Sequence, residues 1–281
     1  MSPIHDQSYR RYSGTKRPLG QSWQVIAGAG IRSFLSRKLF LAVLLCAWIP
    51  FIARAVHLYF VTMYPVAGQL YPVDAKYFMQ FVDQQGFFVF MVTVFAGSGL
   101  IAADRRANAL QVYLSKPLLR IEYIAGKLAI LMTFLTFITV VPGLLLLILQ
   151  VSFAANIDFL RTYPYVVPAV ILSSLARVIV SAFAMLALSS LSKSTRFVAI
   201  MYAGILFFTE AIFGFLSAVT DSTRAAWISV SGNLEILSDV VFRQPHRYET
   251  PATVSVLVLI GVIVVAISVL ERRVRGVEVV A

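Results

Sequence analysis

The chain has 281 residues, of which 59% are hydrophobic and only 13% charged. A soluble globular domain carries about 25% charged residues, so most of this chain is expected to be solvated by lipid. The net charge of +11 lies in short segments between apolar runs, which argues against a nucleic-acid-binding surface. One cysteine and three scattered histidines leave no internal disulfide and no clustered metal-site spacing.

The first part of the chain is polar and basic. Residues 1–20 are rich in Ser, Gly, Pro and charge, which predicts a disordered cytoplasmic tail. Residues 21–38 predict an amphipathic helix, either lying in the inner membrane interface or packed on the rest of the protein. Its apolar face consists of Trp23, Ile26, Ala27, Gly30, Ile31 and Phe34.

Six apolar runs follow, each close to the roughly 20 residues that a helix needs to cross a bilayer. They are Leu39–Phe60, Gln84–Ala103, Leu128–Gln150, Val166–Leu191, Phe197–Val219 and Pro251–Leu270. The sequence therefore predicts an all-α membrane protein whose transmembrane domain spans 39–271, followed by a cytoplasmic tail at 272–281. Pro50 and Pro142 fall within these runs and are expected to kink their helices.

The orientation follows from the positions of Lys and Arg, because positively charged short loops stay in the cytoplasm. With both termini inside, the inner segments carry Arg10, Arg11, Lys16, Arg17, Arg32, Arg37, Lys38, Arg105, Arg106, Lys116, Arg120, Lys127, Lys193, Arg196, Arg272, Arg273 and Arg275. The outer loops carry only Lys76, Arg161, Arg224, Arg243 and Arg247. This asymmetry predicts an N-in, C-in arrangement.

The outer segment between the last two spans, residues 220–250, has an apolar middle that is unlike a free linker. We expect it to form a short helix, capped by Ser231 or Asn233, that packs against or dips into the outer leaflet.

Ionisable residues inside predicted spans are costly and are candidates for function. Arg177 and Glu210 lie at equal depth on consecutive antiparallel spans, so we expect them to form an ion pair. That pair is either a static strut or a group that changes partners during transport. Arg54 and His57 are near the outer end of the first span, where Arg54 can extend to the surface or line a vestibule.

The sequence contains no Walker A loop, no G-x-G-x-x-G, no H-E-x-x-H and no G-x-S-x-G motif. We therefore expect no enzymatic activity, cofactor or metal in this chain. If ATP drives the protein, a partner subunit binds it.

The inner loop after the second span is the most informative segment. Asp104, Arg105 and Arg106 mark the exit from lipid. An apolar face of a short helix is predicted at Ala109, Leu110, Tyr113 and Leu114, and Pro117 ends that helix. An amphipathic helix just below the membrane suits docking to a cytosolic protein; the alternative is a plain amphiphilic loop.

This loop reads A-D-R-R-A-N-A-L-Q-V-Y-L-S-K-P-L-L-R-I-E-Y-I-A-G-K from Ala103 to Lys127. It resembles the permease subunits of type-2 ATP-binding-cassette exporters, in which G/N-A-L-x-x-Y-L-S-x-P-L-x-R-x-x-Y-x-x-G-K follows an acidic-basic exit. The matching residues are Asn108, Ala109, Leu110, Tyr113, Leu114, Ser115, Pro117, Leu118, Arg120, Tyr123, Gly126 and Lys127.

The resemblance implies that residues 104–120 form a coupling helix in a groove of a cytosolic ATPase. It also implies a second contact at residues 192–196, which include Lys193 and Arg196, and a second permease subunit that is either a copy of this chain or a paralogue. The location it implies is the cell (inner) membrane. The glycine and acidic signatures of the polysaccharide and heme branches are absent, so the substrate class does not follow.

Three other functions compete with the exporter permease. A stand-alone secondary transporter or channel would rely on Arg177 and Glu210 as its midplane polar groups. An intramembrane enzyme would need a nucleophile with a base, or a carboxylate cluster, inside the spans. A scaffold that binds an ATPase without exporting anything would keep the same inner loop.

Overall fold

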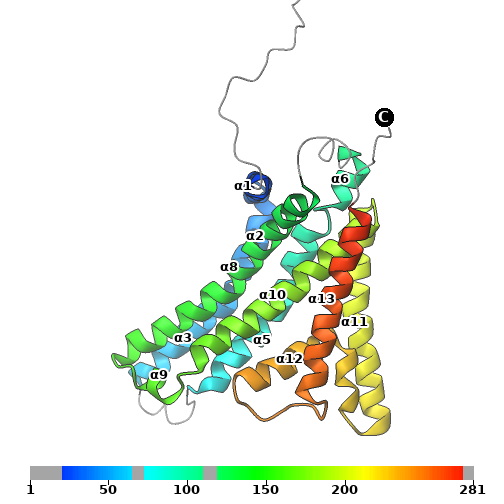
Figure 1. Cartoon of the computed structure of the whole chain (residues 1–281). Helices are drawn as coiled ribbons and strands as arrows, with labels where there is room; N and C mark the ends of the chain where they lie inside the picture. The colour runs from blue at the N-terminus through cyan, green and yellow to red at the C-terminus, as the bar shows by residue number, and fades with distance from the viewer. Residues whose placement is uncertain (1–20, 65–72, 110–118, 275–281) are drawn as a thin grey trace, which may run out of the picture.

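The computed structural model describes residues 21–64, 73–109 and 119–274, which form a bundle of helices with no strand among them (Figure 1). The tail at 1–20 lies outside the described residues, as does most of the tail at 272–281. Leu110, Tyr113, Leu114 and Pro117 of the inner loop also lie outside them.

Six helices of the described residues are long and apolar enough to cross a membrane, which confirms the predicted multi-pass all-α architecture. The candidate spans are Lys38–Met63, Ala75–Arg106, Arg120–Ala154, Val166–Leu191, Thr195–Thr220 and Ala252–Arg273. The second and third begin nine and eight residues earlier than predicted, at Ala75 instead of Gln84 and at Arg120 instead of Leu128.

Two of the spans are interrupted. The first consists of α2 (Lys38–Cys46) and α3 (Ile49–Met63), and Pro50 lies in the first turn of α3, where its missing N–H costs little. The second consists of α5 (Ala75–Val92), a π-helical turn η1 (Thr93–Gly97) and α6 (Ala102–Arg106). Pro142, in contrast, lies inside the continuous helix α8 (Arg120–Ala154).

Two helices form the centre of the bundle: α8 and α10 (Val166–Leu191) bury most of their side chains. Most side chains of α11 (Thr195–Thr220) and α13 (Ala252–Arg273) are exposed within the chain. Because a spanning helix with an exposed apolar surface is solvated by lipid or by another subunit, these two helices form an outer wall.

α1 (Ser22–Leu35) and the end of α13 lie at the same end of the bundle, as an even number of spans requires (Figure 1). The basic residues at this end include Arg32, Arg106, Arg196 and Arg272. We call it the inner end, following the positive-inside asymmetry.

The predicted amphipathic helix is present as α1, and it packs against the first turns of α8. Ala27 and Phe34 are buried, whereas Gln24, Arg32 and Ser36 on the polar side are exposed. Close packing depends on Gly126, where an added Cβ would lie 2.8 Å from the Ile26 Cβ and 3.0 Å from the Trp23 carbonyl oxygen.

The outer segment after α11 contains the 3-10 turn η2 (Arg224–Ile228) and the predicted short helix α12 (Val230–Val241). The short helix α9 (Asp158–Thr162) lies in a different segment, between α8 and α10. The cap prediction was wrong: Ser229 is the N-cap of α12, and its hydroxyl accepts a hydrogen bond from the Gly232 N–H at 2.9 Å. α12 crosses the outer end of the bundle between α10 and α13 (Figure 1).

Candidate functional site

The predicted ion pair between Arg177 and Glu210 is not formed. Nη2 of Arg177 lies 3.1 Å from Oδ1 of Asp83 on α5, and Glu210 instead accepts a hydrogen bond from the Ser229 hydroxyl. Depth in the membrane alone does not determine in which direction each helix points its side chain, so two residues at equal depth need not meet.

Asp83 belongs to a cluster of charged groups at the outer end. Its Oδ2 lies 2.6 Å from Nη2 of Arg247, a residue of the segment between α12 and α13. Arg247 also contacts Asp239 on α12, from Nε to Oδ1 at 2.8 Å, and Glu235 on α12 at 3.7 Å. The cluster thus joins α5, α10 and α12, and it contains three carboxylates and two guanidinium groups.

Burial and charge affect the groups of this cluster that lie outside the spans. Burial raises the pKa of Glu235, although the Tyr248 hydroxyl, which donates a hydrogen bond to its carboxylate at 2.8 Å, opposes the shift. Burial lowers the pKa of Arg247, but Asp83 and Asp239 outweigh it and raise that pKa overall. Arg247 therefore stays charged and holds α12 against α5.

Asp83 was missed because the second span was predicted to begin at Gln84, one residue too late to include it. The helix begins at Ala75, where the carboxylate of Asp74 accepts a hydrogen bond from the Tyr77 N–H at 3.0 Å. An Asp followed by a periodic apolar run is the ordinary signal of a helix start, and it was available in the sequence.

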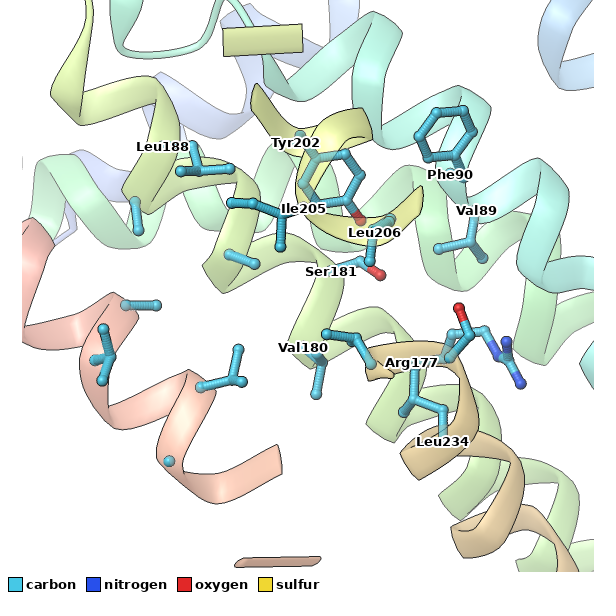
Figure 2. A pocket seen from close by; sticks show the side chains of 18 of the residues that line it. Val89, Phe90, Arg177, Val180, Ser181, Leu188, Tyr202, Ile205, Leu206 and Leu234 are labelled. Atoms are coloured by element: carbon cyan, nitrogen blue, oxygen red, sulfur yellow. The ribbon is translucent and has the colours of Figure 1, made fainter. Parts of the chain in front are cut away.

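A partly open cavity of about 510 Å³ lies next to this cluster, lined by residues of α5, α10, α11, α12 and α13 (Figure 2). Its wall is mostly Val, Leu, Ile, Ala and Phe, and its polar lining residues are Arg177, Ser181, Tyr202 and Ser231. Val230, Ser231 and Leu234 of α12 line its outer end. The volume falls within the range of sites for small molecules.

At the inner end, Asp104 fixes the base of the loop that carries the family resemblance. Its Oδ2 lies 2.7 Å from Nζ of Lys127 and accepts a hydrogen bond from the Tyr123 hydroxyl at 2.7 Å. Three polar residues of the motif therefore hold its first and last parts together. Gly126, another residue of the motif, allows α1 to approach α8.

A second set of contacts joins this loop to the cavity wall. The Ser189 hydroxyl on α10 accepts hydrogen bonds from the Ile101 and Ala102 N–H groups, at 3.1 and 3.0 Å, and donates one to the Ser98 carbonyl at 3.0 Å. Arg105 donates to the Ser190 carbonyl. The turn before α6 is thus tied to α10, whose preceding turns line the cavity.

The remaining predicted contact residues lie at the inner end. Arg106, Arg120, Lys193 and Arg196 are all exposed, and all four are close to helix ends. Their predicted contact with an ATPase remains a prediction.

Arg54 does not extend freely to the surface as predicted. Its Nη1 donates to the Tyr77 carbonyl at 2.8 Å, and the Tyr77 hydroxyl donates to the Arg54 carbonyl at 2.9 Å. His57 stacks on the same tyrosine ring. Arg54 therefore joins α3 to the first turn of α5, and neither residue lines the cavity.

No protein-family model and no curated protein sequence matches this chain. The described residues contain no group of three or more His, Cys, Asp or Glu side chains arranged to hold a metal ion.

Proposed function

We propose that this chain is the membrane-spanning permease subunit of an ATP-binding-cassette exporter. In this proposal a separate cytosolic ATPase binds and hydrolyses ATP, the inner loop docks on it, and the cavity beside α10 holds the transported molecule. A second permease subunit completes the assembly in the cell (inner) membrane.

The observation that carries the proposal is the set of contacts from the base of the inner loop to the cavity wall. Ser189 and Ser190 connect the turn before α6 to α10, and Ser181 and Arg177 lie two and three turns further along the same helix. A force applied to the loop would be transmitted to α10 because buried hydrogen bonds in a low dielectric are costly to break. Differential affinity of ATP for one arrangement of the ATPases supplies the work.

The stand-alone transporter loses the pair on which it depended, since Arg177 contacts Asp83 and not Glu210. A stand-alone transporter would have to use the charged cluster at the outer end, which includes Asp83, Arg177 and Arg247, as its polar groups. The two functions differ in one requirement: the permease needs an ATPase, and the stand-alone transporter does not.

The test is affinity purification of the tagged chain from its native membranes in mild detergent, followed by mass spectrometry of the proteins that remain bound. The intact chain should retain an ATPase with a Walker A motif. A variant with Leu110→Glu and Leu114→Glu should lose it, because charge on the apolar face of the loop prevents docking.

The matched control is Arg224→Glu, a charge change at an exposed residue of the outer end. It should retain the ATPase as the intact chain does. Circular dichroism of each purified variant separates loss of docking from loss of folding. A folded intact chain that retains no ATPase contradicts the proposal and favours the stand-alone transporter.

A further inference from the structure

We infer that the cavity beside α10 is a binding site for an uncharged, largely apolar molecule that offers one hydrogen-bond acceptor at its outer end. That this molecule is the one transported rests on the proposed function; that it binds does not.

The lining determines the apolar character of the ligand. Most lining residues are aliphatic, and the inner part of the wall includes Leu188, Leu191, Val265 and Val269. A void with such walls offers water too few hydrogen-bond partners to be stably hydrated. Apart from α12, the walls belong to helices that are long and apolar enough to cross the membrane, so the ligands within reach are molecules dissolved in the bilayer.

The charges determine that the ligand is neutral. Among the described residues, no Asp or Glu lines the cavity, so a cation would find no counter-ion on its wall. An anion would meet Arg177, but that guanidinium is already paired with Asp83. Glu235 and Asp239 add two further carboxylates near it, against the single additional arginine Arg247. The field at the outer end therefore does not favour an anion.

Arg177 leaves a buried donor for an acceptor on the ligand. Nε of Arg177 is buried and has no hydrogen-bond partner among the described residues, although the residue is only 6% exposed. Arg177 lies on the cavity wall, and the hydroxyls of Ser181 and Tyr202 lie further in along it (Figure 2). A hydroxyl or carbonyl oxygen on the ligand would satisfy such a donor without adding charge.

Gly261 provides a way to fill the cavity. It lines the cavity from α13, and a Cβ built there meets no heavy atom within 4 Å. Gly214 on α11 likewise has no heavy atom within 4 Å of its Cβ but does not line the cavity. Gly261→Phe and Gly214→Phe are therefore a matched pair that differ in whether the added ring can enter the cavity.

The experiment uses the full chain in phosphatidylcholine nanodiscs, without ATP or any ATPase, and a set of photoactivatable decyl probes. The probes share one chain-borne diazirine and carry an alcohol, a carboxylate or an ammonium head. We expect the alcohol to label residues of α10 and α13 at the cavity, in a manner that excess 1-decanol competes away. Gly261→Phe should abolish this competable labelling, and Gly214→Phe should leave it intact.

If Gly261→Phe impairs folding, Gly261→Leu provides the same test with a smaller side chain. Equal competable labelling in the Gly261 and Gly214 variants would overturn the inference, as would stronger competable labelling by the carboxylate or ammonium probe. Cross-links from Gly261→Cys to a second copy of the chain would also overturn it, since they would place another subunit at the opening. If the chain retains an ATPase in the affinity purification but shows no competable labelling, the binding site is refuted and the permease proposal stands.

Discussion

Neutralising Asp83 should destabilise the folded chain more than neutralising any other carboxylate of the outer cluster. In Asp83→Asn the guanidinium of Arg177, which is 6% exposed, loses the only carboxylate within 4 Å of it among the described residues. Leaving a buried charge unpaired in this way costs about 3–5 kcal/mol of the free energy of unfolding. Arg247 suffers less, because Asp239 and Glu235 remain beside it.

The assay is equilibrium unfolding in mixed micelles at increasing dodecyl sulfate, followed by circular dichroism. Asp83→Asn together with Arg177→Gln should be about 2 kcal/mol more stable than the sum of the single changes predicts, because the double variant buries no unpaired charge. Glu210→Gln, which removes only the partner of the Ser229 hydroxyl, should cost about 1 kcal/mol. A loss for Glu210→Gln as large as for Asp83→Asn, or strict additivity in the double variant, would refute the pairing.

Three further changes test other parts of the structure. Gly126→Ala should lower the free energy of unfolding by about 1–3 kcal/mol, because the added methyl group overpacks α1 against α8. Gly28→Ala should be neutral or stabilising, because a Cβ at Gly28 meets no heavy atom within 4 Å. Thermal unfolding in nanodiscs measures both changes. Burial raises the pKa of Glu235 above its ordinary 4.5, so its contribution to stability is present below pH 4.5 and is lost as pH rises through the folded pKa. Glu235→Gln should therefore lack that part of the decline in unfolding free energy, and identical pH profiles would contradict the assignment. Ser189→Ala should lower the free energy of unfolding by about 1–3 kcal/mol, because it leaves buried backbone groups unsatisfied. It should also uncouple ATP hydrolysis from transport in reconstituted vesicles. The control is Thr133→Ala, since the Thr133 hydroxyl bonds only within its own helix.

The spans could be predicted because an apolar run long enough to cross the bilayer has to hydrogen-bond its own backbone there, and an α-helix does this within a single segment. Val166–Leu191 was predicted to the residue, and the helix of the outer segment was also expected. The starts of the second and third spans were harder to predict, since the stretches that were left out carry Lys76 and Asp83 in the second and Arg120 and Glu122 in the third, which lower the local hydropathy.

The partners of charged groups could not be predicted from depth alone. Arg177 and Glu210 lie on adjacent spans, but the rotation of α11 about its axis directs Glu210 toward Ser229 of the segment that follows it. The contact between Asp83 and Arg247 joins residues 164 positions apart, and no periodicity in the sequence relates them. The cavity was not foreseen for the same reason, because it depends on how five elements pack.

The position of a nucleotide-binding partner tests the central claim most directly. In a chain with Cys46→Ala, single cysteines replace Arg106 and Lys193 at the inner end, or Arg224 at the outer end, and a short maleimide–diazirine cross-linker is attached in native membranes and activated by light. The permease proposal predicts cross-links from positions 106 and 193 to an ATP-binding-cassette ATPase, and none from position 224. Absence of such a protein from the inner-end cross-links, with the chain folded and in the membrane, would contradict it.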